Sequence, residues 1–173
     1  MKSYKEKLAA ITTFIFDVDG VLTDGKVHFY KDEQVRSFNM RDCFAINYAA
    51  KMEYQLFIIT KGDSQTVEKQ LLDFGATEVC LNAVNKLHVY DTLKSKYEFT
   101  DEEVVYMGDD IPDYNVLKVV GVSTCPQDAA PEIKQICDYQ SPYSGGNRCV
   151  RDIIEQTLRV QGKWFSIGKT NKL

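Results

Sequence analysis

The chain has 173 residues, of which 44% are apolar and 27% are charged, so a globular fold is expected and a disordered chain is disfavoured. The formal charge of −4 argues against a nucleic-acid-binding protein, because such proteins present a basic face to the phosphates. No apolar run approaches the roughly 20 residues that cross a bilayer, so no membrane span is expected.

The N-terminus and the cysteines indicate the compartment. The first ten residues are charged and lack the apolar stretch of a secretion signal. The five cysteines are widely spaced and include no C-x-x-C pair, which is typical of reduced thiols rather than of a zinc site or a disulfide framework. We therefore expect a cytoplasmic protein with one domain over residues 1–161 and a tail over residues 162–173. The tail carries Trp164 and Phe165, which we expect to dock on a protein surface.

Short apolar runs alternate with amphipathic stretches along the chain. In chain order, we expect a strand at 11–17, a β-hairpin at about 26–38, a helix at 42–53, a strand at 55–60, a helix at 64–74 and a strand at 78–81. We then expect a helix at 85–97, a strand at 103–108, a helix at 112–119, a strand at 121–124, a helix at 131–135, a strand at 136–139 and a helix at 148–160. This alternation predicts a three-layer, doubly wound α/β fold with a mainly parallel sheet and an inserted hairpin.

Polar side chains follow three of the predicted strands. In a doubly wound sheet, ligands bind beyond the carboxyl ends of the strands, so these side chains are expected to meet. Crowded carboxylates raise each other's pKa unless a cation lies between them, and Mg²⁺ prefers oxygen ligands. A single Asp at such a place is better explained as a helix cap, but a set at successive strand ends favours a metal site. The residues concerned are Asp17, Asp19, Thr60, Asp109, Asp110 and Asp113.

The same residues resemble the four motifs of the haloacid dehalogenase (HAD) superfamily of phosphotransferases. Residues 17–23 match the first motif, Asp-x-Asp-Gly-x-x-Thr, and residues 108–113 match the fourth, Gly-Asp-Asp-x-x-Asp. Thr60 and Lys86 stand where the second and third motifs place a Thr and a Lys. The resemblance implies a HAD-like fold and a Mg²⁺-dependent phosphatase that forms an aspartyl-phosphate.

The resemblance also implies a role for each carboxylate. Asp17 would be the nucleophile, and Asp19 would protonate the leaving oxygen and then take a proton from water. Asp17, Asp109 and the backbone carbonyl of Asp19 would hold the metal. Asp110 and Asp113 would support the site, and Asp113 is expected to orient its neighbours rather than to bind the metal.

Two residues would hold the phosphate oxygens: Thr60 through its hydroxyl and Lys86 through its charge. The plain alternative for Lys86 is an exposed side chain in the first turn of a helix, where the helix dipole disfavours a cation. The stretches between Asp19 and Thr60, and between Thr60 and Lys86, are too short for a folded cap domain. An uncapped site is open to water, so another segment has to close it.

Nearly the whole chain is similar to the capless phosphatases that act on 3-deoxy-D-manno-octulosonate 8-phosphate (KDO 8-phosphate), an intermediate on the way to lipopolysaccharide. The resemblance implies a phosphorylated sugar acid as substrate and a homotetramer, in which hairpins and C-terminal segments enclose neighbouring sites. Arg41 matches a family position that contacts the sugar acid, although a solvated Arg near a helix start is an equally good interpretation. Asn39 is expected to support the same loop, and Asp42 to cap the helix at 42–53.

Two segments depart from this family. Lys61, Gly62 and Asp63 follow Thr60, where the family has Gly and then Arg, and residues 145–148 read Gly-Gly-Asn-Arg instead of Gly-Gly-Arg-Gly. Lys61 or Arg148 is expected to replace the missing cation. The departures keep two other substrates open, 2-keto-3-deoxynononate 9-phosphate or a broader pool of sugar phosphates. A non-catalytic HAD scaffold is the alternative from another class, and the intact motifs argue against it.

Overall fold

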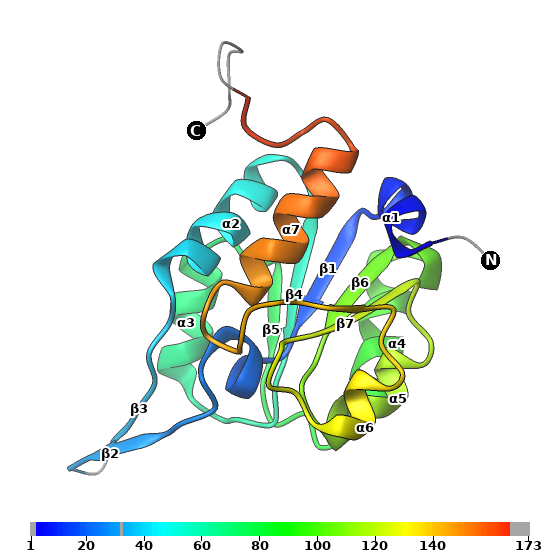
Figure 1. The fold of residues 1–173 in the computed structure, drawn as a ribbon. Coiled ribbons are helices and arrows are strands. Elements are labelled where there is room, and N and C mark those ends of the chain that lie inside the picture. The colour runs from blue at the N-terminus through cyan, green and yellow to red at the C-terminus, as the bar shows by residue number, and fades with distance from the viewer. Residues whose placement is uncertain (1–2, 32, 167–173) are drawn as a thin grey trace.

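The computed structural model describes residues 3–31 and 33–166. Its central sheet is parallel throughout and confirms the predicted doubly wound α/β fold without a cap domain (Figure 1). Strand β1 lies in the middle, so the chain winds outward first to one edge and then to the other. The strand order is β5 (Glu78–Cys80), β4 (Gln55–Ile59), β1 (Thr13–Phe16), β6 (Val104–Met107), β7 (Val122–Cys125) and β8 (Tyr139–Gln140).

Helices cover both faces of the sheet (Figure 1). The longer helices are α2 (Met40–Lys51), α3 (Gln65–Asp73), α4 (Lys86–Tyr97) and α7 (Cys149–Val160). The shorter ones are α1 (Tyr4–Lys7), α5 (Tyr114–Leu117) and α6 (Pro131–Lys134). Single turns lie at Leu8–Ala10, Val18–Leu22, Asp101–Glu103 and Ile111–Asp113. Within the described residues, none of the helices has the length and apolar character that a transmembrane span requires.

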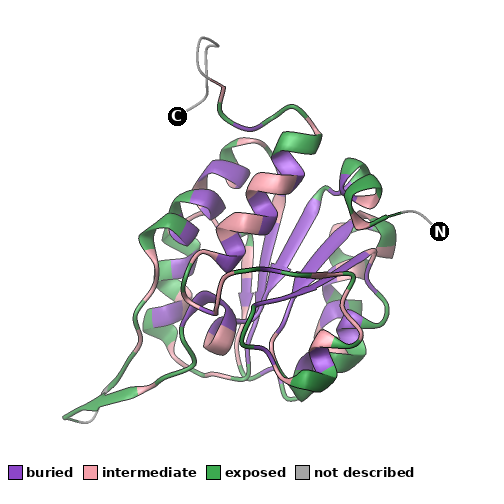
Figure 2. Cartoon of the chain, viewed as in Figure 1, coloured by how far each residue is buried: buried purple, intermediate pink, exposed green. Residues whose placement is uncertain are grey.

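The sheet separates two hydrophobic cores, because successive side chains of a strand point to opposite faces. Phe14 and Phe16 of β1 pack in the core that contains residues of α2, α3 and α7. Ile15 points the other way, into the core formed with α4, α5 and α6. All four residues of β1 are buried (Figure 2), and three of them are large apolar side chains, as expected of a strand that is covered on both faces. Both cores thus hold the carboxyl end of β1 in a fixed position.

The predicted hairpin is present and projects away from the body of the molecule (Figure 1). Strands β2 (His28–Tyr30) and β3 (Glu33–Val35) pair antiparallel as a separate two-stranded sheet. Phe29 and Tyr30 are 77% and 66% exposed, although aromatic side chains are normally found in a core or an interface. The hairpin therefore presents an apolar surface that the described part of the chain does not cover.

Helix α2 begins earlier than expected. It starts at Met40, and Asn39 caps it by accepting a hydrogen bond from the N–H of Arg41 at 2.9 Å. The prediction that Asp42 caps this helix was wrong. The buried Asp42 carboxylate instead accepts the N–H groups of Arg148 and Arg151, at 3.0 and 2.7 Å, and so satisfies the start of α7.

The part of the tail that is described docks on its own chain. Trp164 is buried, and the centre of its ring lies 5.0 Å from that of Tyr48 in α2. Its backbone N–H donates to the carbonyl of Leu158. Phe165 remains 42% exposed. The rest of the predicted tail, residues 167–173, lies outside the described residues. The expected docking of Trp164 is therefore explained within one subunit.

Candidate active site

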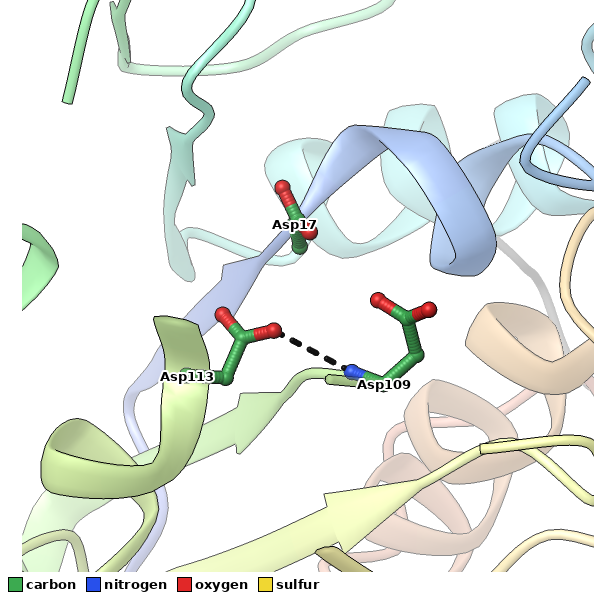
Figure 3. Close-up of side chains that lie close together, drawn as sticks. All are labelled: Asp17, Asp109 and Asp113. Atoms are coloured by element: carbon green, nitrogen blue, oxygen red, sulfur yellow. Dashed lines mark hydrogen bonds between the residues drawn. The ribbon is translucent and has the colours of Figure 1, made fainter. Parts of the chain in front are cut away.

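Three aspartates from two strand ends point toward one another beside the sheet (Figure 3). Asp17 directly follows β1, and its N–H continues the ladder by bonding to the carbonyl of Met107 in β6 at 3.1 Å. Its Oδ1 accepts the N–H of Val18 at 2.7 Å, which fixes the carboxylate at the start of the next turn. Asp109 and Asp113 follow β6, the neighbouring strand, so the parallel pairing of β1 and β6 brings the three residues together.

The three carboxylates form a group that fits a divalent metal ion. One oxygen from each of Asp17, Asp109 and Asp113 lies within 4.8 Å of the other two. Burial, and then the charge of Asp113, raise the pKa of Asp17 to about 7. Burial, and then Asp17, raise the pKa of Asp109 to about 7 as well. Oxygen donors that are this costly to ionise together are the donor set that a hard cation such as Mg²⁺ stabilises.

Asp113 is the most deeply buried member of this group, and both of its oxygens accept hydrogen bonds. Its Oδ1 accepts hydrogen bonds from Lys86 Nζ at 2.7 Å and from the hydroxyl of Tyr106 at 2.5 Å. Its Oδ2 accepts the N–H of Asp109 at 3.2 Å, the bond drawn in Figure 3. The side chain is 1% exposed. These contacts support the interpretation that Asp113 orients Lys86 and the Asp109 loop.

Lys86 places a buried positive charge between two of the aspartates. Its Nζ lies 2.9 Å from Oδ2 of Asp17 and 2.7 Å from Oδ1 of Asp113, and its side chain is only 3% exposed. Burial opposes the charge, but Asp17 and Asp113 together raise the pKa of Lys86, so the ammonium form persists. Lys86 opens α4, where the dipole disfavours a cation, so the carboxylates are what retains it there.

Thr60 and Asp19 lie beside the three aspartates and line the same cavity. Thr60 follows β4 and is buried, and its Oγ1 accepts the N–H of Gly62 at 3.1 Å, so the hydroxyl hydrogen can donate to a bound oxygen. Asp19 lies in the turn after β1, next to Gly20 with φ +93°. A side chain on Gly20 would collide with the carboxylate of Asp109, so glycine is required there by both the conformation and the space.

The predicted nucleophile, acid–base, metal and phosphate residues line one cavity of about 180 Å³. Lys61 and Asp110 line it as well, so the structure brings together every predicted residue that follows a strand of the central sheet or begins α4. The cavity opens to solvent, and its lining carries the carboxylates, the hydroxyl and the ammonium group that would hold a metal and a phosphoryl group.

Three predicted substrate contacts lie elsewhere. Arg41 and Arg148 line a separate hollow of about 530 Å³ beside α7, where the guanidinium group of Arg148 lies 4.3 Å from the ring centre of Tyr143. Asn39 uses both ends of its amide within the chain, as the α2 cap and in a 3.3 Å bond to the carbonyl of Gly146. Their roles in substrate binding stay predictions, because a single chain does not place them at the aspartates.

Arg36 also lies at the site, although the sequence did not indicate it as a site residue. The guanidinium group of Arg36, just after β3, donates to both oxygens of Asp19, at 2.8 and 3.1 Å. Arg36 lies in the predicted hairpin segment, directly after β3, where the chain returns from the projecting hairpin to the body of the molecule and so reaches Asp19 (Figure 1). The sequence signal was a single cation at the end of a β-rich run, which is also common on exposed strands.

Comparisons with known proteins agree with this geometry. Residues 26–147 match the family of haloacid dehalogenase-like hydrolases. The 3-deoxy-D-manno-octulosonate 8-phosphate phosphatase KdsC of Escherichia coli K12 is 34% identical over 158 residues, which span 91% of this chain and 84% of KdsC.

Two solved structures share the fold. The KDO 8-phosphate phosphatase of Moraxella catarrhalis, in complex with a magnesium ion, a phosphate ion and KDO, is 25% identical, with a TM-score of 0.89 over 92% of each chain. The cobalt-bound phosphatase of Haemophilus influenzae is 30% identical, with a TM-score of 0.87 over 91% of this chain and 92% of that one.

Proposed function

The chain belongs to the haloacid dehalogenase-like hydrolase family, and from this premise we propose that it is a Mg²⁺-dependent phosphatase that hydrolyses KDO 8-phosphate to KDO and phosphate. The observation that carries the phosphatase is the buried Lys86 ammonium between Asp17 and Asp113, beside Asp109. The observation that favours the sugar acid is similarity over nine-tenths of the chain to phosphatases named for KDO 8-phosphate.

The first half of the proposed reaction transfers the phosphoryl group to the protein. A carboxylate oxygen of Asp17 attacks phosphorus, the bond from phosphorus to the sugar oxygen breaks, and an aspartyl-phosphate forms. Asp19 gives a proton to the departing sugar oxygen, which leaves as an alcohol. Thr60 and Lys86 hold the phosphate oxygens, and Lys86 also keeps the Asp17 carboxylate in place through its 2.9 Å contact.

The second half returns the protein to its starting state. Asp19 takes a proton from a water molecule, whose oxygen attacks phosphorus and releases the phosphate from Asp17. Asp17, Asp109 and the backbone carbonyl of Asp19 are the groups proposed to hold the metal. Bound Mg²⁺ supplies the positive charge that lets an anionic carboxylate approach an anionic phosphate.

Phosphate release from KDO 8-phosphate, with Mg²⁺ and with EDTA, tests this function. We expect release only with the metal and none from Asp17→Asn, whose fold should be retained because the change is isosteric. A panel that adds the nononate 9-phosphate and simple sugar phosphates tests the substrate. A flat kcat/KM profile across this panel would contradict the sugar-acid assignment, while release from no ester would contradict the phosphatase.

We also propose that the protein is a homotetramer whose neighbouring subunits complete each site. The hairpin supports this, because its Phe29 and Tyr30 side chains are exposed in a single chain. Mass measurement in solution tests the assembly. The expected result is a tetramer for the wild-type chain and smaller species for Phe29→Ser with Tyr30→Ser. A wild-type monomer with full activity would contradict the proposal.

A cytoplasmic location is proposed on the basis of the cysteines. All five are free thiols in the structure, and Cys43, Cys125 and Cys149 are buried. Free thiols persist in a reducing compartment. Fractionation of cells that express the protein at its natural level tests this, and recovery in the periplasmic fraction would contradict it.

A further inference from the structure

The carboxylate of Asp19 accepts two hydrogen bonds from Arg36, which directly follows the hairpin strand β3. Arg36 Nε donates to Oδ1 of Asp19 at 2.8 Å, and Arg36 Nη2 donates to Oδ2 at 3.1 Å. Two parallel N–H bonds from one guanidinium group fix both the position and the plane of a carboxylate. The Arg36 side chain is 7% exposed, whereas that of Asp19 is 32% exposed and lines the cavity. Arg36 therefore holds Asp19 without lining the cavity itself.

The guanidinium group is itself fixed by its surroundings. Arg36 Nη1 donates to Gln34 Oε1 at 3.3 Å. Its Nη2 lies 3.9 Å from the place that a Cβ on Gly62 would take, so the group reaches the segment after β4 that also carries Thr60. The hydrogen bond to Asp19 raises the pKa of Arg36 despite its burial, so the cation is permanent. Arg36 thus connects the hairpin to two of the strand ends that form the site.

Apart from Arg36, the described residues give the Asp19 side chain only one further hydrogen-bond partner. Thr23 Oγ1 lies 3.3 Å from Oδ1 of Asp19 but also 3.3 Å from the carbonyl of Val18, and it has one hydrogen to donate. A carboxylate that exchanges protons with a leaving group must be placed to within a fraction of an ångström, since a displacement of about 1 Å lowers a rate by as much as 10²-fold. The two hydrogen bonds from the guanidinium group of Arg36 provide this placement.

We propose, on the basis of the phosphatase function above, that Arg36 is the positioning residue for proton transfer by Asp19 and links this transfer to the placement of the hairpin. Arg36 acts through Asp19 and not on the phosphate. Lysine cannot replace it fully, because an ammonium group supplies the charge but not two parallel N–H donors in one plane. Since Arg36 directly follows β3, any partner that immobilises the hairpin also immobilises the guanidinium group of Arg36.

The test compares Arg36→Met and Arg36→Lys on two esters. The sugar oxygen of KDO 8-phosphate needs a proton to leave, whereas 4-nitrophenolate leaves readily without one. For Arg36→Met we expect kcat on KDO 8-phosphate to fall by about 10- to 100-fold with KM within about twofold. The single-turnover burst of 4-nitrophenolate, which reports only the first half of the reaction, should slow by about threefold or less. Arg36→Lys should recover part of the loss. Lys26→Met is the matched control, because it removes an exposed positive charge of the hairpin segment that pairs with Asp24 and not with Asp19, and it should leave kcat unchanged.

A double variant shows whether Arg36 acts through Asp19. In an Asp19→Asn background, Arg36→Met should lower kcat no further, because residues that act as a unit are not additive. An additive loss, or a burst of 4-nitrophenolate that slows as much as turnover of KDO 8-phosphate, overturns the role of Arg36 while leaving the phosphatase intact. A wild-type protein that hydrolyses neither ester overturns both. Melting temperatures verify folding, and Arg36→Lys serves for the comparison if Arg36→Met does not fold.

Discussion

The Nζ of Lys86 lies 2.9 Å from Oδ2 of Asp17, and both side chains are almost completely buried. A buried ion pair adds little to stability by itself, because the loss of hydration offsets the attraction. Here a second carboxylate, that of Asp113, shares the same ammonium group. Negative charge therefore exceeds positive charge at this place, which is unfavourable for the metal-free fold and suitable for a protein that binds a cation.

Removal of the Lys86 charge is expected to lower both stability and activity. Lys86→Met leaves two buried carboxylates without their cation, which should lower the free energy of unfolding by about 3 to 5 kcal/mol at pH 7.5. Lys86→Arg keeps the charge and should retain more stability. Its larger planar group does not fit at the position of the ammonium group, so this variant should still lose turnover. Urea unfolding and phosphate release measure the two effects. An unchanged urea midpoint for Lys86→Met would contradict the buried network.

The metal-free protein should lose stability as the pH rises. Asp17 and Asp109 have pKa values of about 7 when folded and about 4 when unfolded, so between these values the folded state binds more protons. The unfolding free energy therefore falls from pH 5 to pH 8, and carboxylates with lowered pKa values are already ionised throughout this window. Mg²⁺ should flatten the dependence and stabilise the protein more at pH 8 than at pH 5.5. Thermal melts with EDTA or Mg²⁺ measure this, and a rise in stability from pH 5 to pH 8 without metal would contradict it.

Asp109→Asn should stabilise the metal-free protein while it abolishes turnover. The change removes one of the three clustered charges, so we expect a gain of about 1 kcal/mol at pH 8, which is about 2–4 °C in melting temperature for a chain of this size. The stabilisation by Mg²⁺ should disappear in the same variant. Asp91→Asn alters the net charge equally on an exposed face of α4 and should change neither property. A lower melting temperature for metal-free Asp109→Asn would show that the cluster is not repulsive.

The parts of the fold and site that could be predicted are those with a local cause. Strands β1, β4 and β6 are buried on both faces, so their apolar runs were recognisable and their bounds were close to the observed ones. The residues that follow these strands meet because parallel strands end at one edge. The order of elements was therefore enough to predict that Asp17, Thr60 and Asp109 line one cavity.

The parts that could not be predicted depend on contacts between distant segments. The start of α2 was misplaced because Asp42 has the sequence context of a cap, while its partners are N–H groups more than a hundred residues later. The contact between Arg36 and Asp19 depends on the direction in which the hairpin folds. Helix α1 was not expected because its two turns carry too few apolar residues to show a periodic pattern.

Arg148 allows backbone strain to be separated from substrate binding. It has φ +77°, a conformation that glycine adopts far more readily than arginine, and its side chain is stacked on Tyr143. Arg148→Ala loses the stacking and keeps the strain, so it should be less stable than Arg148→Gly by about 1 kcal/mol in urea unfolding. If Arg148 also reaches the substrate in the assembled protein, both variants should raise KM for KDO 8-phosphate equally, despite their different stabilities. If the less stable variant instead has the higher KM, Arg148 has a structural role and does not contact the substrate.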